Sequence, residues 1–364
     1  MSSPQRIIGH LDMDAFFAAI EERDTPRFRG LPLVVGADPK HGNGRGVVST
    51  ANYPARAYGI RSALPITTAW RLSEAARKEG KPAVIFLSGN HRRYEEVSQR
   101  IMARIRIHMP VVQQRSVDEA YVDLCHAGSF EHAAVLCQRL KDDIYRHERL
   151  TASVGIGPNK LVAKIASDAQ KPNGLTIVTD AHAQSFLDPL PIRSVPGVGP
   201  KTELLLRNRG IRTIQDARMV PQDLWSTLLG KWGEALSEKV HGRDASPLRD
   251  PAPAKSVSEQ HTFSHDTLEA SVILERLFRL CADVMRRLSE EGAYGFRTVA
   301  VTVRFFTFET TSRSRTHRLP LRTLRDLQRD ALALLLPFLD RRENPRQHPV
   351  RLIGVRVEKL LRSA

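Results

Sequence analysis

The stretch GHLDMDAFFAAIEER, residues 9–23, decides the fold at the start of this chain. The apolar run Ile7–Leu11 predicts a short strand, which ends in the tripeptide DMD. Residues 15–23 follow with apolar side chains along one helical face, so they predict a helix. A strand that ends in acids and leads directly into a helix predicts an α+β domain with carboxylates at the strand's end.

A second pair of acids lies in SVDEAYVDLC, residues 116–125, whose alternation of apolar and polar residues predicts a strand. Adjacent side chains of a strand face opposite sides, so Asp118 and Glu119 share a face only where a bulge or a strand end turns one of them. Asp12 and Asp14 are two residues apart and can share a face. Carboxylates on neighbouring strands repel one another unless a cation lies between them, and Mg²⁺ is a cation that such oxygen ligands bind.

Each acidic motif alone is a weak signal, because ordinary structural roles explain it as well. Turn formation and solvated strand ends account for most acids of this kind, and Asp14 also fits the capping position of the helix that follows it. The acids therefore need further context before they indicate a metal site.

The remaining pattern mixes strands and helices and divides the chain. One α+β domain is predicted up to about residue 175, a small helical unit at 190–240, a linker rich in Pro and charge at 241–254, and a second α+β pattern after it. The further strands are predicted at 33–35, 47–50, 83–87, 152–156, 298–309 and 350–358. The further helices are predicted at 67–79, 91–108, 131–147, 159–169, 267–290 and 321–338.

The composition favours a polyanionic partner. The 364 residues include 55 Lys+Arg and 40 Asp+Glu, a net charge of +15 and a pI near 10.2, so nucleic acid or an anionic membrane surface is the expected partner class. The longest apolar stretch, residues 331–338, is far shorter than a membrane span, and the N-terminus has no signal-peptide pattern. Three scattered cysteines fit a reducing compartment.

Part of this basic excess is concentrated near the C-terminus, in TTSRSRTHR, residues 310–318. Arg313, Arg315 and Arg318 lie close together there, and the segment continues a predicted strand. This pattern is typical of a sheet edge or loop that grips phosphates, and a solvated basic face explains it as well.

Several long motifs then follow in a fixed order, and together they are specific. They are HLDMDAFFAAIEER at 10–23, STANYPARAYGIRSALP at 49–65, SVDEAY at 116–121, VGIGPNKLVAKIASDAQKPNG at 154–174 and SVPGVGPKTELL at 194–205. In this order and over the whole chain, the sequence resembles the Y-family DNA polymerases and is most similar to their DinB branch.

The resemblance implies an α+β multidomain fold shaped like a right hand. By that likeness the palm is 1–17 and 75–175, short fingers are 18–74, and a helix-hairpin-helix thumb is 176–240. A linker at 241–253 tethers a little finger at 254–364. Short fingers cover the nascent base pair poorly, which fits translesion synthesis with low processivity and low fidelity.

The resemblance also assigns the catalytic centre. Asp12, Asp118 and Glu119 are expected to be catalytic and to hold two Mg²⁺ ions, with Mn²⁺ possible, and the backbone carbonyl of Met13 completes one site. The ions serve attack of a primer 3′-hydroxyl on the α-phosphate of a dNTP. Glu119 is the residue whose loss is expected to harm chemistry more than folding.

The nucleotide-binding residues are assigned by the same likeness. Phe17 matches the steric gate that excludes a ribose 2′-hydroxyl. Phe16 beside it is placed with the nucleotide-binding residues, and core packing explains it as well. Tyr53, Arg56 and Lys171 match residues that hold the triphosphate, for which Arg supplies a bidentate contact. Tyr94 resembles a tyrosine packed near the gate, and core packing explains it equally well.

Contacts with DNA are expected in three places. The turn PGVGPK, with Gly197, Gly199 and Lys201, is a helix-hairpin-helix signature that binds a backbone phosphate, and a plain helix–helix turn is the alternative. Lys160 and Lys164, four apart in one helix, either contact DNA or form a solvated face. The little-finger candidates are Arg304, Arg313, Arg315 and Arg318.

Three other functions compete with a DNA-templated polymerase. A deoxycytidyl transferase of the same family needs extra segments that the short fingers do not offer. A non-catalytic DNA-binding accessory predicts missing carboxylates, and a two-metal nuclease has no need of the triphosphate set. The expected partners are primer-template DNA and dNTPs, and no membrane partner is expected. We expect a monomer that is located in the bacterial cytoplasm and associated with the nucleoid. A sliding clamp is a family partner, but RVEKLLRSA at the end lacks the usual peptide.

Overall fold

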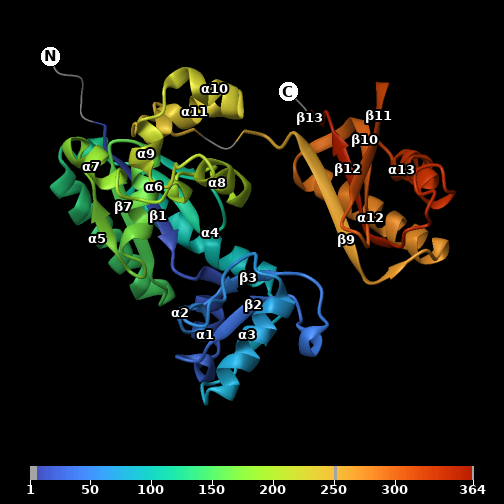
Figure 1. Cartoon of the computed structure of the whole chain (residues 1–364), viewed down its shortest axis with the longest axis horizontal. Coiled ribbons are helices and arrows are strands. Elements are labelled where there is room, and N and C mark those ends of the chain that lie inside the picture. Colours follow the sequence, from blue (N-terminus) through green and yellow to red (C-terminus); the bar gives the residue numbers. More distant parts are fainter. Residues whose placement is uncertain (1–5, 250–251, 363–364) are drawn as a thin grey trace. The chain divides into compact units, whose positions relative to one another are not determined.

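The computed structural model describes residues 6–249 and 252–362, and the chain divides into two compact units, Met1–Pro251 and Ala252–Ala364 (Figure 1). Each unit combines sheets with helices, as the α+β pattern of the sequence predicts. Among the described residues, no helix is long and apolar enough to cross a membrane.

The largest sheet of the first unit places the DMD segment at its centre. Its strand order is β5-β6-β1-β7-β8, with β1 antiparallel to both neighbours. All six residues of β1 are buried, as expected of a central strand covered on both faces. The strands are β1 (Ile8–Met13), β5 (Val112–Gln114), β6 (Glu119–Asp123), β7 (Ala152–Gly157) and β8 (Leu175–Ile177).

The two faces of this sheet have different neighbours. Leu11 and Met13 face a core with α4 (His91–His108) and α5 (Phe130–Glu148). Ile8 faces the other way and packs with Ala163 of α6 (Lys160–Ala169). Since Asp12 alternates with Leu11 and Met13, its side chain is on the α6 face of the sheet. A short 3₁₀ helix, η3 (Cys125–Ala127), links β6 to α5.

A smaller sheet, of order β3-β2-β4, also belongs to the first unit. Its strands are β2 (Leu33–Gly36), β3 (Val48–Ala51) and β4 (Ile85–Leu87). Two helices, α2 (Tyr53–Arg56) and α3 (Ile66–Lys78), pack with it around a separate core. The helix α1 (Phe16–Asp24) packs into the core of the large sheet, and η1 (Pro26–Phe28) and η2 (Lys40–Gly42) are short 3₁₀ helices. The strand predicted at 83–87 therefore pairs with β2, in parallel, rather than with the strands of the large sheet.

Short helices fill residues 180–240 and pack around Trp225, which is fully buried. They are η4 (Asp180–His182), α7 (Ala183–Leu187), η5 (Ile192–Ser194), α8 (Pro200–Arg207), α9 (Ile214–Arg218), α10 (Gln222–Leu229) and α11 (Lys231–Val240). Residues 243–249, in the predicted linker, form no regular element.

The second unit is a sheet with two helices on one face (Figure 1). The strand order is β11-β10-β12-β9, and β13 pairs with the start of β10. The elements are β9 (Ser256–Thr267), α12 (Ala270–Glu290), β10 (Ala293–Phe305), β11 (Thr310–Leu321), α13 (Leu324–Leu339), β12 (Val350–Glu358) and β13 (Leu361–Arg362). The sequence pattern missed β9, and the helix expected at 267–290 begins only after it.

Gly155 of β7 allows α6 to approach the central sheet closely. A Cβ there would lie 2.1 Å from the carbonyl oxygen of Ala163 and 2.3 Å from the backbone nitrogen of Ser167. Overpacking of this kind costs roughly 1–3 kcal/mol, so Gly155→Ala is expected to lower the free energy of unfolding by about 2 kcal/mol.

Tryptophan fluorescence during urea unfolding measures this effect, because Trp70, Trp225 and Trp232 all belong to the first unit. Gly199→Ala is the matched control, since its Cβ would have its nearest neighbour at 4.0 Å and its φ is −84°. Equal stability of the two variants would show that α6 can move away from β7 without cost.

Candidate active site

The two strand-end acids of the sequence motifs meet across the central sheet. The antiparallel register places Asp12 directly opposite Glu119. Residues opposite one another in neighbouring strands share a face, so both carboxylates lie on the α6 side. The sequence predicted neighbouring acidic strands, and the register supplies the pairing.

Lys171 neutralises Asp12. Its ammonium lies 2.8 Å from Asp12 Oδ2 and 2.8 Å from Asp168 Oδ1. Burial, together with the nearby Glu119, raises the pKa of Asp12 to about 7, against the lowering effect of Lys171. Burial lowers the pKa of Lys171, but the carboxylates of Asp12 and Asp168 together raise it above its usual value. A buried acid that is costly to ionise is stabilised by a nearby cation.

Lys164 neutralises Glu119. Its Nζ donates to Glu119 Oε1 at 2.6 Å, from one turn inside α6. On the other side, His10 Nε2 is 3.9 Å from Glu119 Oε2, and burial holds the pKa of His10 well below its usual value. The sequence predicts either DNA contact or a solvated face for Lys164. In the structure Lys164 instead pairs with Glu119, a candidate catalytic acid.

Asp118 precedes β6 and does not lie within it, which corrects the strand predicted over 116–125. Ser116 Oγ accepts from the backbone nitrogens of Asp118 and Glu119 and donates to Asp118 Oδ1 at 2.5 Å. Met13 N donates to the carbonyl oxygen of Asp118 at 3.0 Å. This bend before β6 turns the Asp118 side chain away from the alternation of a regular strand. Such a turn is needed if Asp118 and Glu119 are to serve the same site.

The carboxylates fit a divalent cation by their chemistry. Asp12, Asp118 and Glu119 come from adjacent strand ends and offer only oxygen donors, which hard cations prefer. Among residues 6–249 and 252–362, however, no three acidic, His or Cys side chains are gathered as a preformed metal site. Lys171, Lys164 and Ser116 hold the three acids in this structure, so a metal ion would displace ammonium groups to bind there.

A cavity of about 210 Å³ joins this acidic centre to the predicted nucleotide residues. Its lining includes two of the predicted catalytic acids and all five residues that were predicted to bind the nucleotide. The full lining is Asp12, Met13, Ala15, Phe16, Phe17, Ser49, Thr50, Tyr53, Arg56, Ser62, Val117, Asp118 and Lys171. Glu119 does not line it, because its carboxylate is paired with Lys164. The motif search did not single out Ser49, Thr50, Ser62 and Val117, which lie within or beside the quoted motifs.

The two phenylalanines of α1 have different surroundings. Phe16 is buried in the core, with 2% of its surface exposed. The Phe17 ring is partly exposed and stacks on Tyr94, with centroids 4.3 Å apart and planes 13° apart. Tyr94 Oη donates to Glu21 Oε1 at 2.6 Å, which fixes the stacked ring from behind. Phe17 therefore presents its ring to the cavity, and the buried Tyr94 supports that ring from behind.

Tyr53 and Arg56 share the single turn of α2, as their spacing predicts. Arg56 Cζ lies 4.7 Å from the centre of the Tyr53 ring, and Arg56 Nε donates to the carbonyl of Ala51. The N-cap residue Asn52 accepts from Ala55 N and so fixes the start of this turn. Burial, and next the charge of Asp14, raise the pKa of Tyr53 to about 12, so its hydroxyl stays a donor.

Asp14 is not a helix cap, which corrects the role expected for it. The N-cap of α1 is Ala15, in the left-handed region at φ 45°, and no side chain caps the helix. Asp14 is instead buried at 4% exposure and accepts from Thr151 and Ser153 of the neighbouring β7 segment. Tertiary hydrogen bonds have replaced the local capping bond that the sequence pattern favours.

The other residues of the first unit that were predicted to contact DNA differ in their surroundings. Lys160 Nζ donates to Gln113 Oε1 and to the carbonyl of Pro247. Gly197 has φ +102°, and a Cβ there would lie 3.1 Å from the Trp232 ring, so this position requires glycine. Gly199 is the N-cap of α8 with a negative φ, and Lys201 is exposed in the first turn of that helix.

The four little-finger arginines divide between the two faces of their sheet. Arg313 and Arg315 lie opposite the buried Val301 and Val299, so they are on the face that α13 covers. There Arg313 pairs with Glu343, and Arg315 lies 3.5 Å from Asp330.

Arg304 is on the open face of this sheet, as is Thr302 two residues earlier on β10. Thr310 and the buried Leu352 lie directly opposite Arg304 on the two neighbouring strands. Farther along this face, Ser312 lies opposite Thr302, and Ser314 and Arg356 lie opposite Ala300. Arg318 is exposed on β11, beyond the regular register. The close sequence spacing of the β11 arginines therefore does not make one surface.

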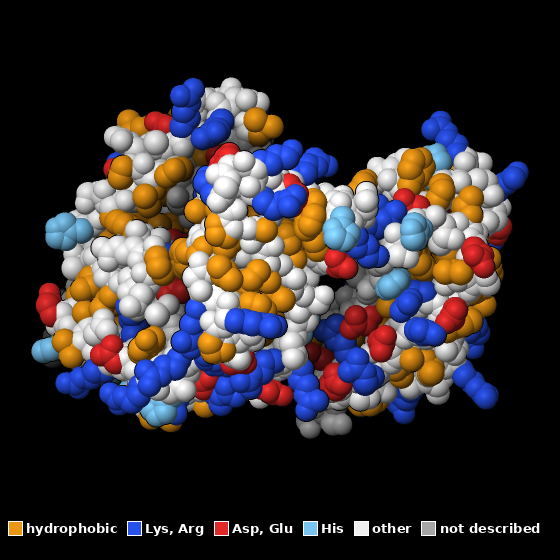
Figure 2. Space-filling model, turned by 90° about the horizontal axis from the view of Figure 1, so that it is seen from below, with side chains coloured by type: hydrophobic (Ala, Val, Ile, Leu, Met, Phe, Trp, Pro, Cys, Tyr) orange, Lys and Arg blue, Asp and Glu red, His pale blue; other side chains and the backbone are white. Residues whose placement is uncertain are grey.

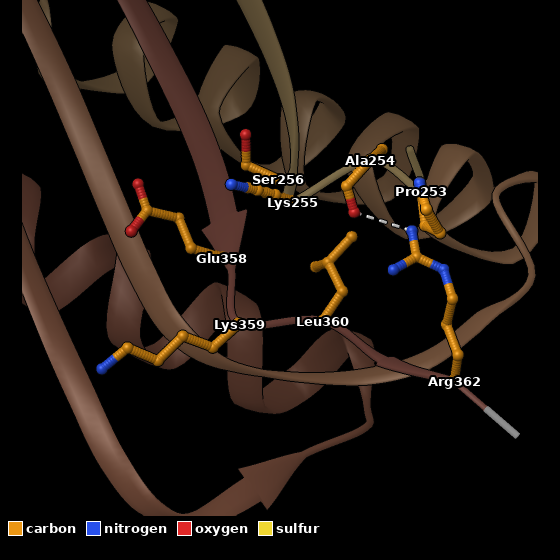
Figure 3. Close-up of a pocket in the computed structure, with 8 residues that line it drawn as sticks. All are labelled: Pro253, Ala254, Lys255, Ser256, Glu358, Lys359, Leu360 and Arg362. Atoms are coloured by element: carbon orange, nitrogen blue, oxygen red, sulfur yellow. Dashed lines mark hydrogen bonds between the residues drawn. The ribbon is translucent and has the colours of Figure 1, made fainter. Parts of the chain in front are cut away.

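Charge on the outer surface is widely spread. On the face shown in Figure 2, Lys and Arg side chains occur over both units, with acidic side chains among them. A second pocket, of about 560 Å³, lies in the second unit beside the start of β9 (Figure 3). Lys255, Lys359 and Arg362 surround it with Glu358, and Arg362 Nη2 donates to the carbonyl of Ala254. It contains none of the predicted site residues.

Comparisons with known proteins identify the family of this chain. The impB/mucB/samB family matches residues 11–168, its helix-hairpin-helix motif matches 180–211, and its C-terminal domain matches 254–364. DNA polymerase IV 2 of Methanosarcina mazei is 41% identical, and the match covers 99% of this chain and 94% of that protein. DNA polymerase IV of Streptococcus mutans is 34% identical, with 99% and 94% covered.

Solved structures show the same likeness. A Y-family DNA polymerase chimera of Dbh and Dpo4 is 28% identical, with a TM-score of 0.85 over 98% of this chain and 100% of that chain. An insertion ternary complex of Dbh DNA polymerase is 27% identical, with a TM-score of 0.65 over the same shares.

Proposed function

This chain belongs to the impB/mucB/samB family, within the DinB branch of the Y-family DNA polymerases, and from that premise we propose how its own residues carry out the reaction. It is a DNA-directed DNA polymerase of the translesion type, it binds primer-template DNA and it depends on a divalent metal ion. The single observation that supports the assignment of residues is the cavity in which Asp12 and Asp118 lie with Phe17, Tyr53, Arg56 and Lys171.

The acidic side of the cavity is assigned to the chemical step. Asp12, Asp118, Glu119 and the carbonyl of Met13 would hold two Mg²⁺ ions, or Mn²⁺ in their place. Bound there, the ions would lower the pKa of the primer 3′-hydroxyl and neutralise the leaving phosphates. The acids would hold those ions, and Ser116 keeps Asp118 turned toward the cavity.

The basic side of the cavity is assigned to the triphosphate. Arg56 supplies a planar guanidinium, Tyr53 a hydroxyl donor and Lys171 an ammonium, and all three line the cavity. Lys171 contacts Asp12 in this structure and would exchange that contact for a phosphate oxygen. The Phe17–Tyr94 stack closes the sugar side and excludes a ribose 2′-hydroxyl.

DNA binding is assigned to backbone contacts that do not read sequence. The turn with Gly197 and Lys201 offers the N-terminus of α8 to a phosphate. In the second unit the open face of the sheet, around Arg304, is favoured over the helix-covered face, where Arg313 and Arg315 already have acidic partners. Low processivity and low fidelity follow from the short fingers.

Arg304→Gln is expected to weaken binding of primer-template DNA about 3- to 10-fold and to reduce the slope of log Kd against log salt by about 1. Arg313→Gln is the matched control on the helix-covered face, where Glu343 already neutralises the guanidinium, and little change is expected. Fluorescence anisotropy with labelled primer-template at several salt concentrations measures both. Equal losses in the two variants would contradict the assignment of the open face.

Primer extension tests the polymerase assignment directly. Purified chain, Mg²⁺ and a labelled primer-template are incubated with and without the four dNTPs. Extension that requires dNTPs supports the polymerase, and shortening without dNTPs indicates a two-metal nuclease. Folded chain that binds DNA and leaves the primer unchanged would support a non-catalytic accessory, which the complete acidic set does not favour.

The setting of the enzyme is proposed on the same premise. We expect a monomeric, cytoplasmic protein associated with the nucleoid of a bacterium. A sliding clamp is proposed as a further partner on the family premise alone.

A further inference from the structure

Asp14 is a buried carboxylate whose two oxygens are both occupied. Oδ1 accepts from Ser153 Oγ at 2.8 Å and from Tyr53 Oη at 3.4 Å. Oδ2 accepts from Thr151 Oγ1 and from the backbone nitrogen of Asn173, both at 2.8 Å. A buried charge is costly unless donors surround it, so four donors on one carboxylate indicate a built network.

The donors come from three segments that are far apart in the sequence. Thr151 and Ser153 belong to the β7 segment, next to β1. Tyr53 opens α2, the turn that also carries Arg56. Asn173 follows two residues after Lys171. Asp14 therefore links the two segments that supply the proposed triphosphate ligands to the central sheet.

The loop after Lys171 depends on this network for its shape. Asn173 is in the left-handed region at φ 57°, and its backbone nitrogen is directed at Asp14. Gly174 N donates to Ser153 Oγ, which itself donates to Asp14. From the other side, the ammonium of Lys141 donates to the carbonyls of Asn173 and Gly174. Asp14 and Lys141 thus hold opposite sides of one short loop.

We propose that Asp14 is a positioning residue that sets the distance between Lys171 and Tyr53, and so the affinity for the triphosphate. This inference rests on the proposed function, because it takes Tyr53 and Lys171 as ligands of the incoming nucleotide. Asp14 itself is not among the residues that line the cavity. Its side chain organises the residues that do.

Asp14→Asn tests the proposal, because asparagine has the same shape but places an NH₂ group where one oxygen accepts two bonds. Losing charged hydrogen bonds to Asn173 or to Tyr53 is expected to raise the dissociation constant for dNTP about 10-fold or more. The measurement is dNTP binding to a complex with a dideoxy-terminated primer, in which no bond forms. The affinity for primer-template DNA without dNTP is expected to stay within about two-fold, because the network lies inside the protein.

Two comparisons separate positioning from general damage. Glu148→Gln is the control, since Glu148 is a buried carboxylate of the same unit that pairs with Arg23 and Arg100 outside the cavity. It is expected to lose stability and keep dNTP affinity. A double-mutant cycle combines Asp14→Asn with Tyr53→Phe. If the Tyr53 hydroxyl bond carries the effect, Asp14→Asn is expected to cause little further loss of dNTP affinity in the Tyr53→Phe background. If the Asn173 bond carries it, the loss of dNTP affinity is expected to be as large as in the wild-type background.

The outcomes are distinct. A raised KM for dNTP with a nearly unchanged kcat supports positioning, and a fall in kcat at constant KM would overturn it in favour of a role in the chemical step. If Asp14→Asn does not fold, Thr151→Val removes one donor only, and an unchanged dNTP affinity in that variant would also overturn the proposal. Failure of wild-type chain to bind dNTP or to extend a primer would instead reject the proposed function itself.

Discussion

Glu119→Gln and Asp118→Asn are each expected to lower the rate of primer extension by about 10³-fold or more. Each variant keeps the size of the side chain and removes one negative charge from the acidic centre, where charge stabilisation is the main contribution to phosphoryl transfer. Single-turnover extension with saturating DNA measures the chemical step. Anisotropy on the same samples is expected to show unchanged DNA affinity.

Asp123→Asn provides the matched control for these variants. Asp123 lies on β6 like Glu119, but at the far end of the strand, where its Oδ1 accepts from Cys125 N. It is expected to keep wild-type extension. If Glu119→Gln retained a tenth of wild-type activity or more, Glu119 would be a structural partner of Lys164 and not a catalytic acid.

Phe17→Ala is expected to reduce discrimination between dCTP and CTP by about 10²-fold, measured as the ratio of their kcat/KM values. The ring excludes a 2′-hydroxyl by filling space, and its removal leaves room for one oxygen atom. Extension with dCTP is expected to fall much less, because the triphosphate ligands remain.

Two neighbouring variants define the wall more closely. Tyr94→Phe removes the hydrogen bond to Glu21 and keeps the stacked ring, so discrimination is expected to persist. Phe16→Leu alters the buried neighbour and is expected to lower stability with little change in selectivity. A loss of discrimination with Phe16→Leu but not with Phe17→Ala would move the gate to the other ring.

The central strand and its acids could be predicted because local sequence determines them. An apolar run, a DMD end and a helical pattern are all contained in residues 7–23, and the structure has β1 and α1 there. The start of β6 could not be read in the same way. Alternation continues through Ser116 and Val117, but hydrogen bonds from backbone nitrogens to the Ser116 hydroxyl form a bend instead.

The roles of Asp14, Lys164 and Arg313 depend on contacts between distant segments. A D-x-D before a helix favours a cap, yet donors from around residues 53, 151 and 173 reach the same carboxylate. Lys164 and Glu119 are 45 residues apart, and Arg313 and Glu343 are 30 apart. Only the strand register and the packing of helices onto sheets bring such partners together, and sequence periodicity contains neither.

The lysine contacts with Asp12 and Glu119 have a consequence for the enzyme between reactions. Two ammonium groups already pair with Asp12 and Glu119, so an idle molecule carries less uncompensated negative charge at its centre. An arriving divalent ion exchanges one set of ion pairs for another, and its net electrostatic gain is correspondingly small. A nucleotide that draws Lys171 to its phosphates frees Asp12 at the same moment. In the resting enzyme, lysine ammonium groups thus occupy carboxylates that would hold the metal ions, and substrate binding makes those carboxylates available.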